Sequence, residues 1–396
     1  MESIRDKVAI IGTGCTKFGE LWDMNYEDMV VDACYEAMQD AGIESKDIQA
    51  AWYGTYSQAQ GGLPLAHALK LEQLPITRIE NACATGGDTV RNAAAFVAAG
   101  LYDIVLAVGV DKSKDKGDPQ KGGKEFGGGN AALFQGAESQ VVFPPFALAA
   151  MRYAHHYGLS VEQLKDTLGR IAIKNHRNGA LNPKAAFQRE ITMEQYLNAP
   201  PINWPLGLYD CCASVDGAAA CIVTTPEIAK HFRDDYVLLK GMGLSIGAKQ
   251  PRLQSTHDMV HAQETVVASQ EAYRMAGIKD PLKELDMAEL HDAFTVVELV
   301  CYEDLGLAPR GGAPAMVRDG VFEREGALPV NIDGGLKAFG HPGGPTGIKM
   351  IYEVCKQMQG KAGKRQLKDV SLAMSHNQGG WAGQYATFVG IYGTRD

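Results

Sequence analysis

A repeat at a constant offset of 235 residues constrains the fold of this chain more than any other feature of its sequence. The stretch 31–43 matches the stretch 266–278, and in both stretches Ala and Met recur at helical spacing. Each stretch ends in Ala-Gly-Ile, where the glycine can adopt the left-handed conformation that commonly ends a helix. Several positions are identical, among them Val31/Val266, Glu36/Glu271, Ala37/Ala272, Ala41/Ala276, Gly42/Gly277 and Ile43/Ile278. The sequence therefore predicts that one structural unit occurs twice.

The segments around the two predicted helices follow one another in the same order. Strand-like apolar runs precede the helices at 7–14 and 236–247, and Gly-rich turns with a helix lead to further apolar strands at 103–110 and 370–375. Strands that alternate with helices favour a layered α/β fold with largely covered sheets. We therefore predict two similar α/β halves.

We place the first half at residues 1–226 and the second at 227–396. The segment at about 115–204 separates parts of the first half and begins with a Gly/Lys-rich stretch. We expect this segment to be an inserted, mostly helical loop domain.

The composition is that of a soluble globular protein, with 45% hydrophobic and 21% charged residues. A net charge of −9 argues against nucleic acid as a general partner, because phosphate binding requires a basic surface. No run reaches the roughly 18 apolar residues of a membrane helix, and no signal-peptide layout is present. The eight cysteines form no CxxC pair and no zinc-type cluster, so we expect free thiols, no metal and a cytoplasmic location.

The first candidate for chemistry is Cys83, within Asn-Ala-Cys-Ala-Thr-Gly-Gly at 81–87. It lies between a strand-like run and a predicted helix, where the helix dipole and free N–H groups stabilise a thiolate. Its small neighbours would let a substrate approach the backbone. A buried cysteine at a helix start is the alternative interpretation of this turn taken alone.

His341 lies in Gly-His-Pro-Gly-Gly-Pro-Thr-Gly at 340–347, a second Gly-rich turn before a helix. A histidine exposed by glycines can accept a proton from a thiol or donate a hydrogen bond to a thioester oxygen. The alternative interpretation is a histidine of a surface loop.

Two further histidines follow apolar runs. His291 begins His-Asp-Ala-Phe at a predicted strand end, where active-site groups of α/β folds commonly gather, and Asp292 is expected to orient the loop or cap the next helix. His376 lies in Ser-His-Asn-Gln-Gly-Gly at 375–380. Either histidine can instead be a structural group. Neither a GxxxxGK[ST] loop nor a strand-following GxGxxG is present, so nucleotide hydrolysis and NAD binding have little support.

These four motifs, in this order, resemble the thiolase superfamily, above all its sterol-carrier-protein-type and archaeal-type members, with benzoylsuccinyl-CoA thiolases among them. The resemblance covers essentially the whole chain. It implies a duplicated thiolase fold of five layers, α/β/α/β/α, with a helical loop insertion and usually in a dimer. It also implies an acyltransferase that performs thiolysis of a 3-oxoacyl-CoA, or Claisen condensation in the reverse direction.

The resemblance implies a Cys83 acyl-enzyme, with His341 assisting the nucleophile and His291 helping to stabilise a thioester enolate. Coenzyme A and acyl-CoA are then substrates, and no permanently bound cofactor is expected. The expected catalytic residues are Cys83, His291, His341 and His376, and the expected acyl-CoA contacts are Gly343, Gly344 and Gly380.

The chain departs from the family at the second cysteine, which many thiolases carry in an HDCF or a C-terminal CxG motif. Ala293 occupies the first position and Ser375-His376-Asn377 the second. The second proton transfer would then fall to His341, His376, water or bound substrate. This departure leaves open a thiolase-fold retro-aldolase, or an acyltransferase with another acceptor. A non-catalytic acyl-CoA-binding subunit is a third possibility, although such a subunit needs none of the catalytic motifs.

Relatives of this kind often work with a small zinc-ribbon/OB-fold partner that helps to bind CoA, and we expect such a heteromeric complex here. Five lysines around the start of the insert can meet CoA phosphates or form a solvated charged loop. The insert is also expected to supply walls of the acyl pocket. The lysines are 112, 114, 116, 121 and 124, and the pocket candidates are Phe143, Phe146, Met151, Trp204 and Trp381, the tryptophans being alternatively core.

Overall fold

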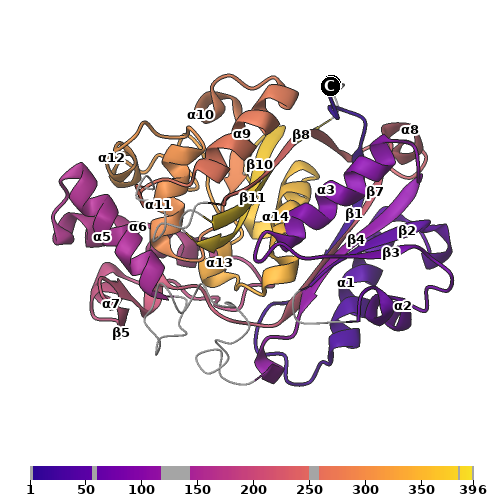
Figure 1. Ribbon diagram of the computed structural model, residues 1–396, viewed down its shortest axis with the longest axis horizontal. Coiled ribbons are helices and arrows are strands. Elements are labelled where there is room, and N and C mark those ends of the chain that lie inside the picture. The colour runs from indigo at the N-terminus through magenta and orange to yellow at the C-terminus, as the bar shows by residue number, and fades with distance from the viewer. Residues whose placement is uncertain (1–2, 56–59, 117–142, 249–257, 382–383, 395–396) are drawn as a thin grey trace.

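The computed structural model describes residues 3–55, 60–116, 143–248, 258–381 and 384–394, and these contain one large mixed sheet that runs through both halves (Figure 1). Its strand order is β3-β2-β4-β7-β1-β8-β11-β10-β9. The strands of the first half are β1 (Ala9–Cys15), β2 (Ala50–Gly54), β3 (Ile76–Ile79), β4 (Ile104–Asp111) and β7 (Gly217–Thr224). Those of the second half are β8 (Val237–Ile246), β9 (Met287–Glu289), β10 (Leu372–Trp381) and β11 (Gln384–Gly393).

The two halves meet where β1 pairs with β8 in antiparallel register, at Ala9–Leu238 and Ile10–Val237. Moving away from this seam, the strands of the first half lie in the order β1, β7, β4, β2 and β3. Along the chain these are its first, fifth, fourth, second and third strands. The strands of the second half lie in the corresponding order β8, β11, β10 and β9. The position equivalent to β3 is occupied by Val330, which forms a parallel bridge with Ala288 of β9. The shared order confirms the duplication that the sequence predicted.

The repeated stretches form helices α1 (Tyr26–Ala41) and α9 (Gln263–Ala276), which pack on β1 and β8 respectively. Both helices end at a left-handed glycine, Gly42 with φ 73° and Gly277 with φ 79°. This is the conformation in which glycine lacks the steric cost of a side chain, so the predicted helix ends are confirmed.

Close contact between strand and helix is also duplicated. A Cβ built on Gly12 of β1 would lie 2.2 Å from the carbonyl oxygen of Ala37, and one on Gly241 of β8 would lie 2.3 Å from that of Ala272. Ala37 and Ala272 are one of the identical pairs of the repeat. Both halves therefore use glycine against alanine to bring the outer helix onto the sheet.

Helices α3 (Thr85–Ala98) and α14 (Gly343–Met358) form the layer between the two halves of this sheet. Helix α14 contacts β4 and β7 of the first half and β10 of the second, and its residues are buried from Gly343 to Gln357. A helix buried on all sides belongs to the interior rather than to a surface. With α1 and α9 on the outer faces, the layers run α/β/α/β/α, so the predicted fold class is confirmed (Figure 1).

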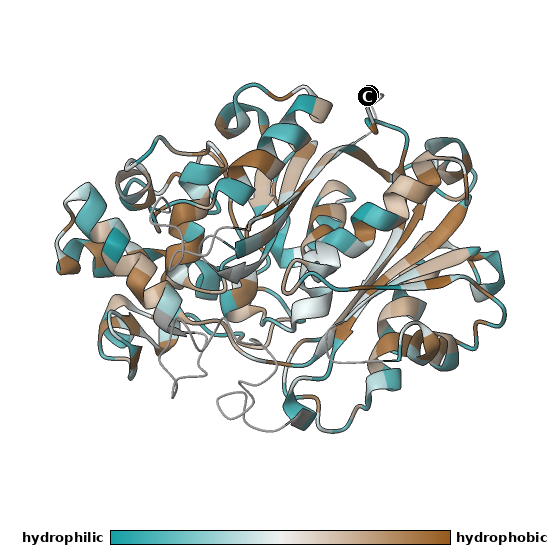
Figure 2. Cartoon of the chain, in the orientation of Figure 1, coloured by the Kyte–Doolittle hydropathy of each residue, from teal (hydrophilic) through white to brown (hydrophobic). Residues whose placement is uncertain are grey.

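The segment between β4 and β7 extends past the predicted end of the insert at about residue 204, and we call all of it the insert. Its described part is mostly helical and packs on helices of the second half. Figure 2 shows that the strands of the first half are hydrophobic along most of their length, as expected for covered sheets. In the described residues, no helix is both long and apolar enough to cross a membrane. The insert contains α5 (Phe143–Tyr157), α6 (Val161–Ala180), α7 (Met193–Leu197), β5 (Pro201–Asn203) and β6 (Leu206–Gly207). The remaining helices are α2 (Leu63–Leu69), α8 (Pro226–Ala229), α10 (Pro281–Glu284), α11 (Thr295–Asp304), α12 (Ala313–Arg318) and α13 (Gly335–Ala338).

Candidate active site

Cys83 lies in the turn that connects β3 to α3, and it is half-buried. The preceding residue, Ala82, has a φ of 48°, in the left-handed region that costs a residue with a side chain about 1–2 kcal/mol. The turn therefore stores strain directly beside the thiol, as is common at functional sites. Its position two residues before α3 places the sulfur at the positive end of the helix dipole, which favours a thiolate.

Asn377 of β10 connects the Cys83 turn to the second half. Its Nδ2 donates a hydrogen bond to the carbonyl oxygen of Cys83 at 2.8 Å, and its Oδ1 accepts one from the Gly87 amide at 3.1 Å. The neighbouring Gly379 touches the same turn, because a Cβ on it would lie 2.5 Å from the Cys83 nitrogen. One strand of the second half therefore fixes the turn that carries the thiol.

His341 lies two residues before α14, in the position equivalent to that of Cys83 before α3. The first turns of the two helices touch, since a Cβ on Gly86 would lie 2.7 Å from the Gly347 nitrogen. The two motifs far apart in sequence thus meet at neighbouring helix starts.

The tautomer of His341 follows from its hydrogen bonds. The hydroxyl of Thr346 donates to the carbonyl oxygen of Pro342 at 2.6 Å, so at its 2.8 Å contact with His341 Nδ1 it acts as the acceptor. Nδ1 therefore carries the proton, and Nε2 keeps its lone pair. Nε2 has no hydrogen-bond partner among the described residues, and burial lowers the pKa of His341 to about 3. The ring is a neutral base with a vacant acceptor.

The ring of His291 meets that of His341 edge to face, with centroids 5.1 Å apart and an interplanar angle of 84°. His291 is only 4% exposed, and its Nδ1 is likewise unpaired within the described part of the chain. Burial, followed by the charges of His341 and His376, holds its pKa well below the usual range. The structure thus brings together two neutral imidazoles that each retain an unused ring nitrogen.

His376 lies next to this pair of histidines and forms a hydrogen bond with the backbone of His291. Its Nδ1 accepts a hydrogen bond from the His291 amide at 3.4 Å, and its Nε2 contacts the hydroxyl of Thr265 on α9 at 3.3 Å. Because neighbouring residues of a strand point to opposite faces, His376 faces α9 while Asn377 faces the Cys83 turn. Both ring nitrogens of His376 are engaged, and its acid/base role stays a prediction.

Asp292 orients the loop that carries His291, which was one of its two expected roles. Its carboxylate accepts hydrogen bonds from the Leu336 amide at 2.5 Å and from Asn175 at 2.8 Å, and helix α11 has no side-chain cap. Burial, together with the charge of Glu298, raises the pKa of Asp292 to about 7. The carboxylate is thus committed to holding two loops together.

The predicted acyl-CoA contacts differ in their surroundings. The Gly344 amide donates to the buried carboxylate of Asp111 at 2.5 Å, and its neighbour Gly343 is buried at the start of α14. Gly380 is half-buried and has a φ of 87°, near the end of β10. Their role as contacts for acyl-CoA stays a prediction.

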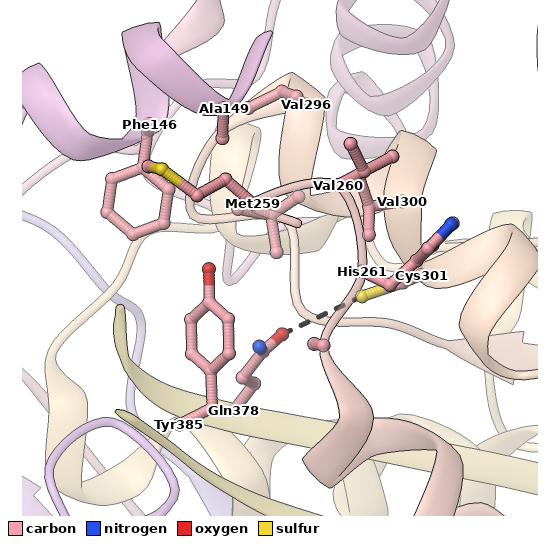
Figure 3. A pocket seen from close by; sticks show the side chains of 12 residues that line it. Phe146, Ala149, Met259, Val260, His261, Val296, Val300, Cys301, Gln378 and Tyr385 are labelled. Carbon is pink, nitrogen blue, oxygen red and sulfur yellow. Dashed lines mark hydrogen bonds between the residues drawn. The ribbon is translucent and has the colours of Figure 1, made fainter. Parts of the chain in front are cut away.

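A small apolar pocket lies beside the site (Figure 3). Its volume is about 30 Å³, and it is lined by Phe146 of α5, by α11, by the segment before α9, and by Gln378 and Tyr385 of the last two strands. The Phe146 ring stacks on that of Phe294 with centroids 4.1 Å apart. Figure 3 shows the Tyr385 hydroxyl pointing toward the side of the pocket where Phe146 and Met259 lie. The predicted pocket wall at Phe146 is thus part of a real cavity.

Other sequence candidates lie elsewhere. Lys112 is buried and ion-paired with Asp216 at 2.8 Å, so it is a core cation rather than a phosphate ligand. Lys114 pairs with Glu20 at 2.7 Å, and Trp204 is 63% exposed instead of lining the pocket. The side chains at 116, 121, 124, 143 and 381 lie outside the described residues.

Sequence reasoning did not assign roles to Asn377 or Thr346, although both lie inside the quoted motifs. The alternation of side chains along a strand separates Asn377 from His376, and the five-residue spacing from His341 brings Thr346 back over the turn. These two regularities are the sequence signals from which the roles of Asn377 and Thr346 could have been predicted.

Comparison with known proteins adds family information. The family model described as the thiolase N-terminal domain matches residues 8–198, and the one described as thiolase C-terminal domain-like matches residues 246–392. An acetyl-CoA acetyltransferase of Methanothermobacter thermautotrophicus is 36% identical over 96% of this chain and 98% of its own length. The benzoylsuccinyl-CoA thiolase subunit BbsB of Thauera aromatica is 30% identical over 94% and 95%. A solved structure described as an Ltp2-ChsH2(DUF35) aldolase superposes with a TM-score of 0.84 at 27% identity, over 99% of both chains.

Proposed function

This chain belongs to the thiolase family and is an acyltransferase of the thiolase type, and from this premise we propose that Cys83 carries the acyl group in thiolysis or condensation of acyl-CoA. The observation that carries the assignment is the His341 tautomer. Thr346 leaves Nε2 of His341 as a vacant proton acceptor, and the first turns of α3 and α14 bring His341 next to the turn that carries Cys83. A thiol beside a neutral imidazole has the base that it needs to become a nucleophile.

In the direction of thiolysis, Cys83 passes its proton to His341 Nε2, and its sulfur attacks the 3-keto carbon of a 3-oxoacyl-CoA. The bond between C2 and C3 then breaks, which leaves an acyl group on Cys83 and releases acetyl-CoA as its enolate. A second CoA thiol attacks the acyl-enzyme and restores Cys83. The thioester oxygen of the enolate carries developing charge, and His291 can donate a ring N–H to it, a kind of interaction that contributes about 3–4 kcal/mol where it has been measured.

Intact-mass analysis after incubation with acetyl-CoA or with a panel of 3-oxoacyl-CoAs tests this proposal. We expect a mass increase equal to one acyl group, lost in Cys83→Ala and kept in Cys355→Ala, whose thiol is buried in α14 away from the site. An adduct of unchanged yield in Cys83→Ala would assign the acyl group to another residue and overturn the proposal.

An aldolase is the second candidate. It is favoured by the aldolase structure that aligns over 99% of this chain and by the absence of a cysteine at residue 293 or at residues 375–377. An aldolase breaks its carbon–carbon bond without an acyl-enzyme. Aldol cleavage that survives Cys83→Ala, in a protein that forms no adduct with any thioester, would establish this function instead.

We also propose that the pocket beside Phe294 takes the distal end of the acyl group. Phe294 follows the His291 turn directly, and Gln378 of the pocket follows Asn377, which holds Cys83. The wall residues are mainly apolar, as is typical of a site for a hydrocarbon chain.

A homodimer in the cytoplasm, working with a small CoA-binding partner, completes the proposal. The aldolase structure, described as Ltp2-ChsH2(DUF35), supports a partner, and the eight free thiols fit a reducing compartment. Light scattering of the purified chain measures its own oligomeric state. Full activity and full CoA affinity of the purified chain alone would rule out an essential partner.

A further inference from the structure

The end of the insert, residues 211–213, lies between the two histidine turns. The Cys212 amide donates to the carbonyl oxygen of Ala293 at 2.8 Å, one residue beyond Asp292. The His341 amide donates in turn to the carbonyl oxygen of Ala213 at 3.0 Å. Cys212 is therefore held by backbone hydrogen bonds on both sides, against the His291 loop and against the His341 loop.

Cys212 is also close enough to Cys83 for their charges to interact. Burial raises the pKa of the Cys212 thiol, the positive charge of Lys337 lowers it, and negative charge on Cys211 and Cys83 raises it further. At neutral pH Cys212 is thus a protonated thiol within the electrostatic reach of the proposed nucleophile. Its side chain is half-buried, so it is neither sealed in the core nor on the open surface.

The other cysteines differ from Cys212 in their surroundings, although Cys211 also runs along the His291 loop, in an antiparallel bridge with Phe294. Those at 15, 34, 221, 301 and 355 are buried, and Cys301 donates to Gln378 in the pocket at 3.7 Å. The Cys211 thiol donates to the carbonyl oxygen of Gly207, within the insert, at 3.5 Å. Cys212 is the thiol that lies beside Ala293, the position at which this chain lacks the second cysteine of its family.

Independent of any thiol, this region has unused hydrogen-bonding groups. Nδ1 of the buried His291 and Nε2 of His341 have no partner among the residues that the structure describes. Buried polar atoms without a partner are costly, and two of them side by side are consistent with groups that a bound substrate or water satisfies. The two atoms belong to rings in edge-to-face contact, so they mark one site rather than two.

We propose that Cys212, supplied by the insert, is the second acid/base of the reaction. This inference rests on the proposed function of Cys83. In thiolysis the Cys212 S–H gives its proton to C2 of the leaving acetyl-CoA enolate. The resulting thiolate takes the proton of the incoming CoA thiol as the CoA sulfur attacks the acyl group on Cys83. In condensation the CoA that leaves when Cys83 is acetylated takes the Cys212 proton, and the Cys212 thiolate formed in this way removes a proton from C2 of the second acetyl-CoA. Each turnover returns Cys212 to its starting form.

Partial reactions separate this role from that of Cys83. We expect p-nitrophenyl acetate to acetylate Cys212→Ala at a rate within about twofold of wild type, because this leaving group departs as a stable anion that needs no proton from Cys212, and Cys83 and His341 are intact. Exchange of the C2 hydrogens of acetyl-CoA in deuterium oxide, and condensation, should both fall by roughly 100-fold or more, the contribution of a general acid/base. The matched control is Cys211→Ala, which should keep all three rates.

C2 exchange at the wild-type rate in Cys212→Ala would overturn the inference while leaving a Cys83 acyl-enzyme untouched. A wild-type protein that forms no acyl-enzyme at all would instead refute the proposed function. The two failures are therefore distinguishable.

A labelling experiment on the unmodified sequence guards against misfolding of the variant. Enzyme first acetylated on Cys83 is treated with bromoacetyl-CoA, in which a thiolate displaces bromide at C2, and the labelled peptide is identified by mass spectrometry. We expect the carboxymethyl-CoA thioether on Cys212 and protection by excess acetyl-CoA. Label on Cys211, label elsewhere, or no label on the acetylated enzyme would contradict the assignment.

Discussion

Thr346 determines which nitrogen of His341 is basic. Its hydroxyl donates to Pro342 and accepts from Nδ1, so the lone pair of the imidazole is on Nε2. The hydroxyl belongs to the first turns of α14. Burial, together with the positive charge of Lys349, lowers the pKa of His341 and keeps the ring neutral. The proposed base is therefore positioned by its own helix rather than by a carboxylate, which would also have raised its pKa.

Removal of the Thr346 hydroxyl should allow the proton of the His341 ring to occupy either nitrogen. In Thr346→Val we expect acylation of Cys83 by acetyl-CoA to slow by roughly tenfold or more, since a general base contributes about 10²–10⁴ in rate. Thr346→Ser keeps the hydroxyl and should stay close to wild type. Rapid-quench mass spectrometry measures the rate, and equal rates in Thr346→Val and wild type would exclude a role for the tautomer.

The buried histidines should make stability depend on pH. Burial lowers the pKa of both His341 and His376 from 6.5 to about 3. The unfolded chain takes up their protons as the pH falls below about 6.5, whereas the folded chain does so only near 3. The free energy of unfolding should thus be highest above pH 7 and fall by about 1.4 kcal/mol per pH unit for each histidine toward pH 4.

Urea unfolding between pH 8 and pH 5 measures this slope. The variant His376→Asn should flatten it by the contribution of about one proton. A slope that His376→Asn leaves unchanged would show that His376 is already protonated in the folded protein.

Gly379 should tolerate no side chain. A Cβ there would lie 2.5 Å from the Cys83 nitrogen, and the backbone of the turn cannot move aside without displacing the thiol. We expect Gly379→Ala to reduce the rate of acyl-enzyme formation by at least tenfold, because misplacement of reacting groups by about 1 Å costs about 100-fold. The control is Gly19→Ala, where the nearest atom would be 4.0 Å away. Similar acylation rates in the two variants would show that β10 does not fix the Cys83 turn.

Phe146 should limit the length of the acyl group. Phe146→Leu removes the ring that stacks on Phe294 and enlarges the pocket while keeping an apolar side chain. We expect the ratio of kcat/KM for eight-carbon over four-carbon 3-oxoacyl-CoA to rise roughly tenfold, as hydrophobic pockets discriminate by about 1–3 kcal/mol per methylene. Leu148→Ala, on the exposed side of the same helix, should leave the ratio unchanged. An unaltered ratio in Phe146→Leu would place the acyl chain elsewhere.

Much of the architecture could be predicted because its signals are local. The glycines that end α1 and α9 and the small residues that repeat along both helices are visible within short windows of sequence. The same is true of the Gly-rich turns that carry Cys83 and His341. These features depend on backbone conformation, which neighbouring residues largely determine.

The contacts across the site could not be predicted in this way. Asn377 holds Cys83 across 294 residues of chain, and the hydrogen bond from Cys212 to Ala293 joins the insert to the second half. The burial of Lys112 against Asp216 likewise required a partner 104 residues away. A single sequence contains the residues of such pairs but not the information that they meet.

The seam between β1 and β8 has a consequence for the origin of the catalytic pair. When two copies of one unit pair symmetrically through their first strands, the start of a given helix in one copy lies next to the start of the same helix in the other copy. In such an ancestor, identical turns would have met as they do in a symmetric dimer. In the present chain one of these turns carries Cys83 and the other His341, so a contact that would be symmetric between identical copies joins the proposed nucleophile to its proposed base. Neither half alone contains both members of the proposed pair, so the proposed reaction requires both halves.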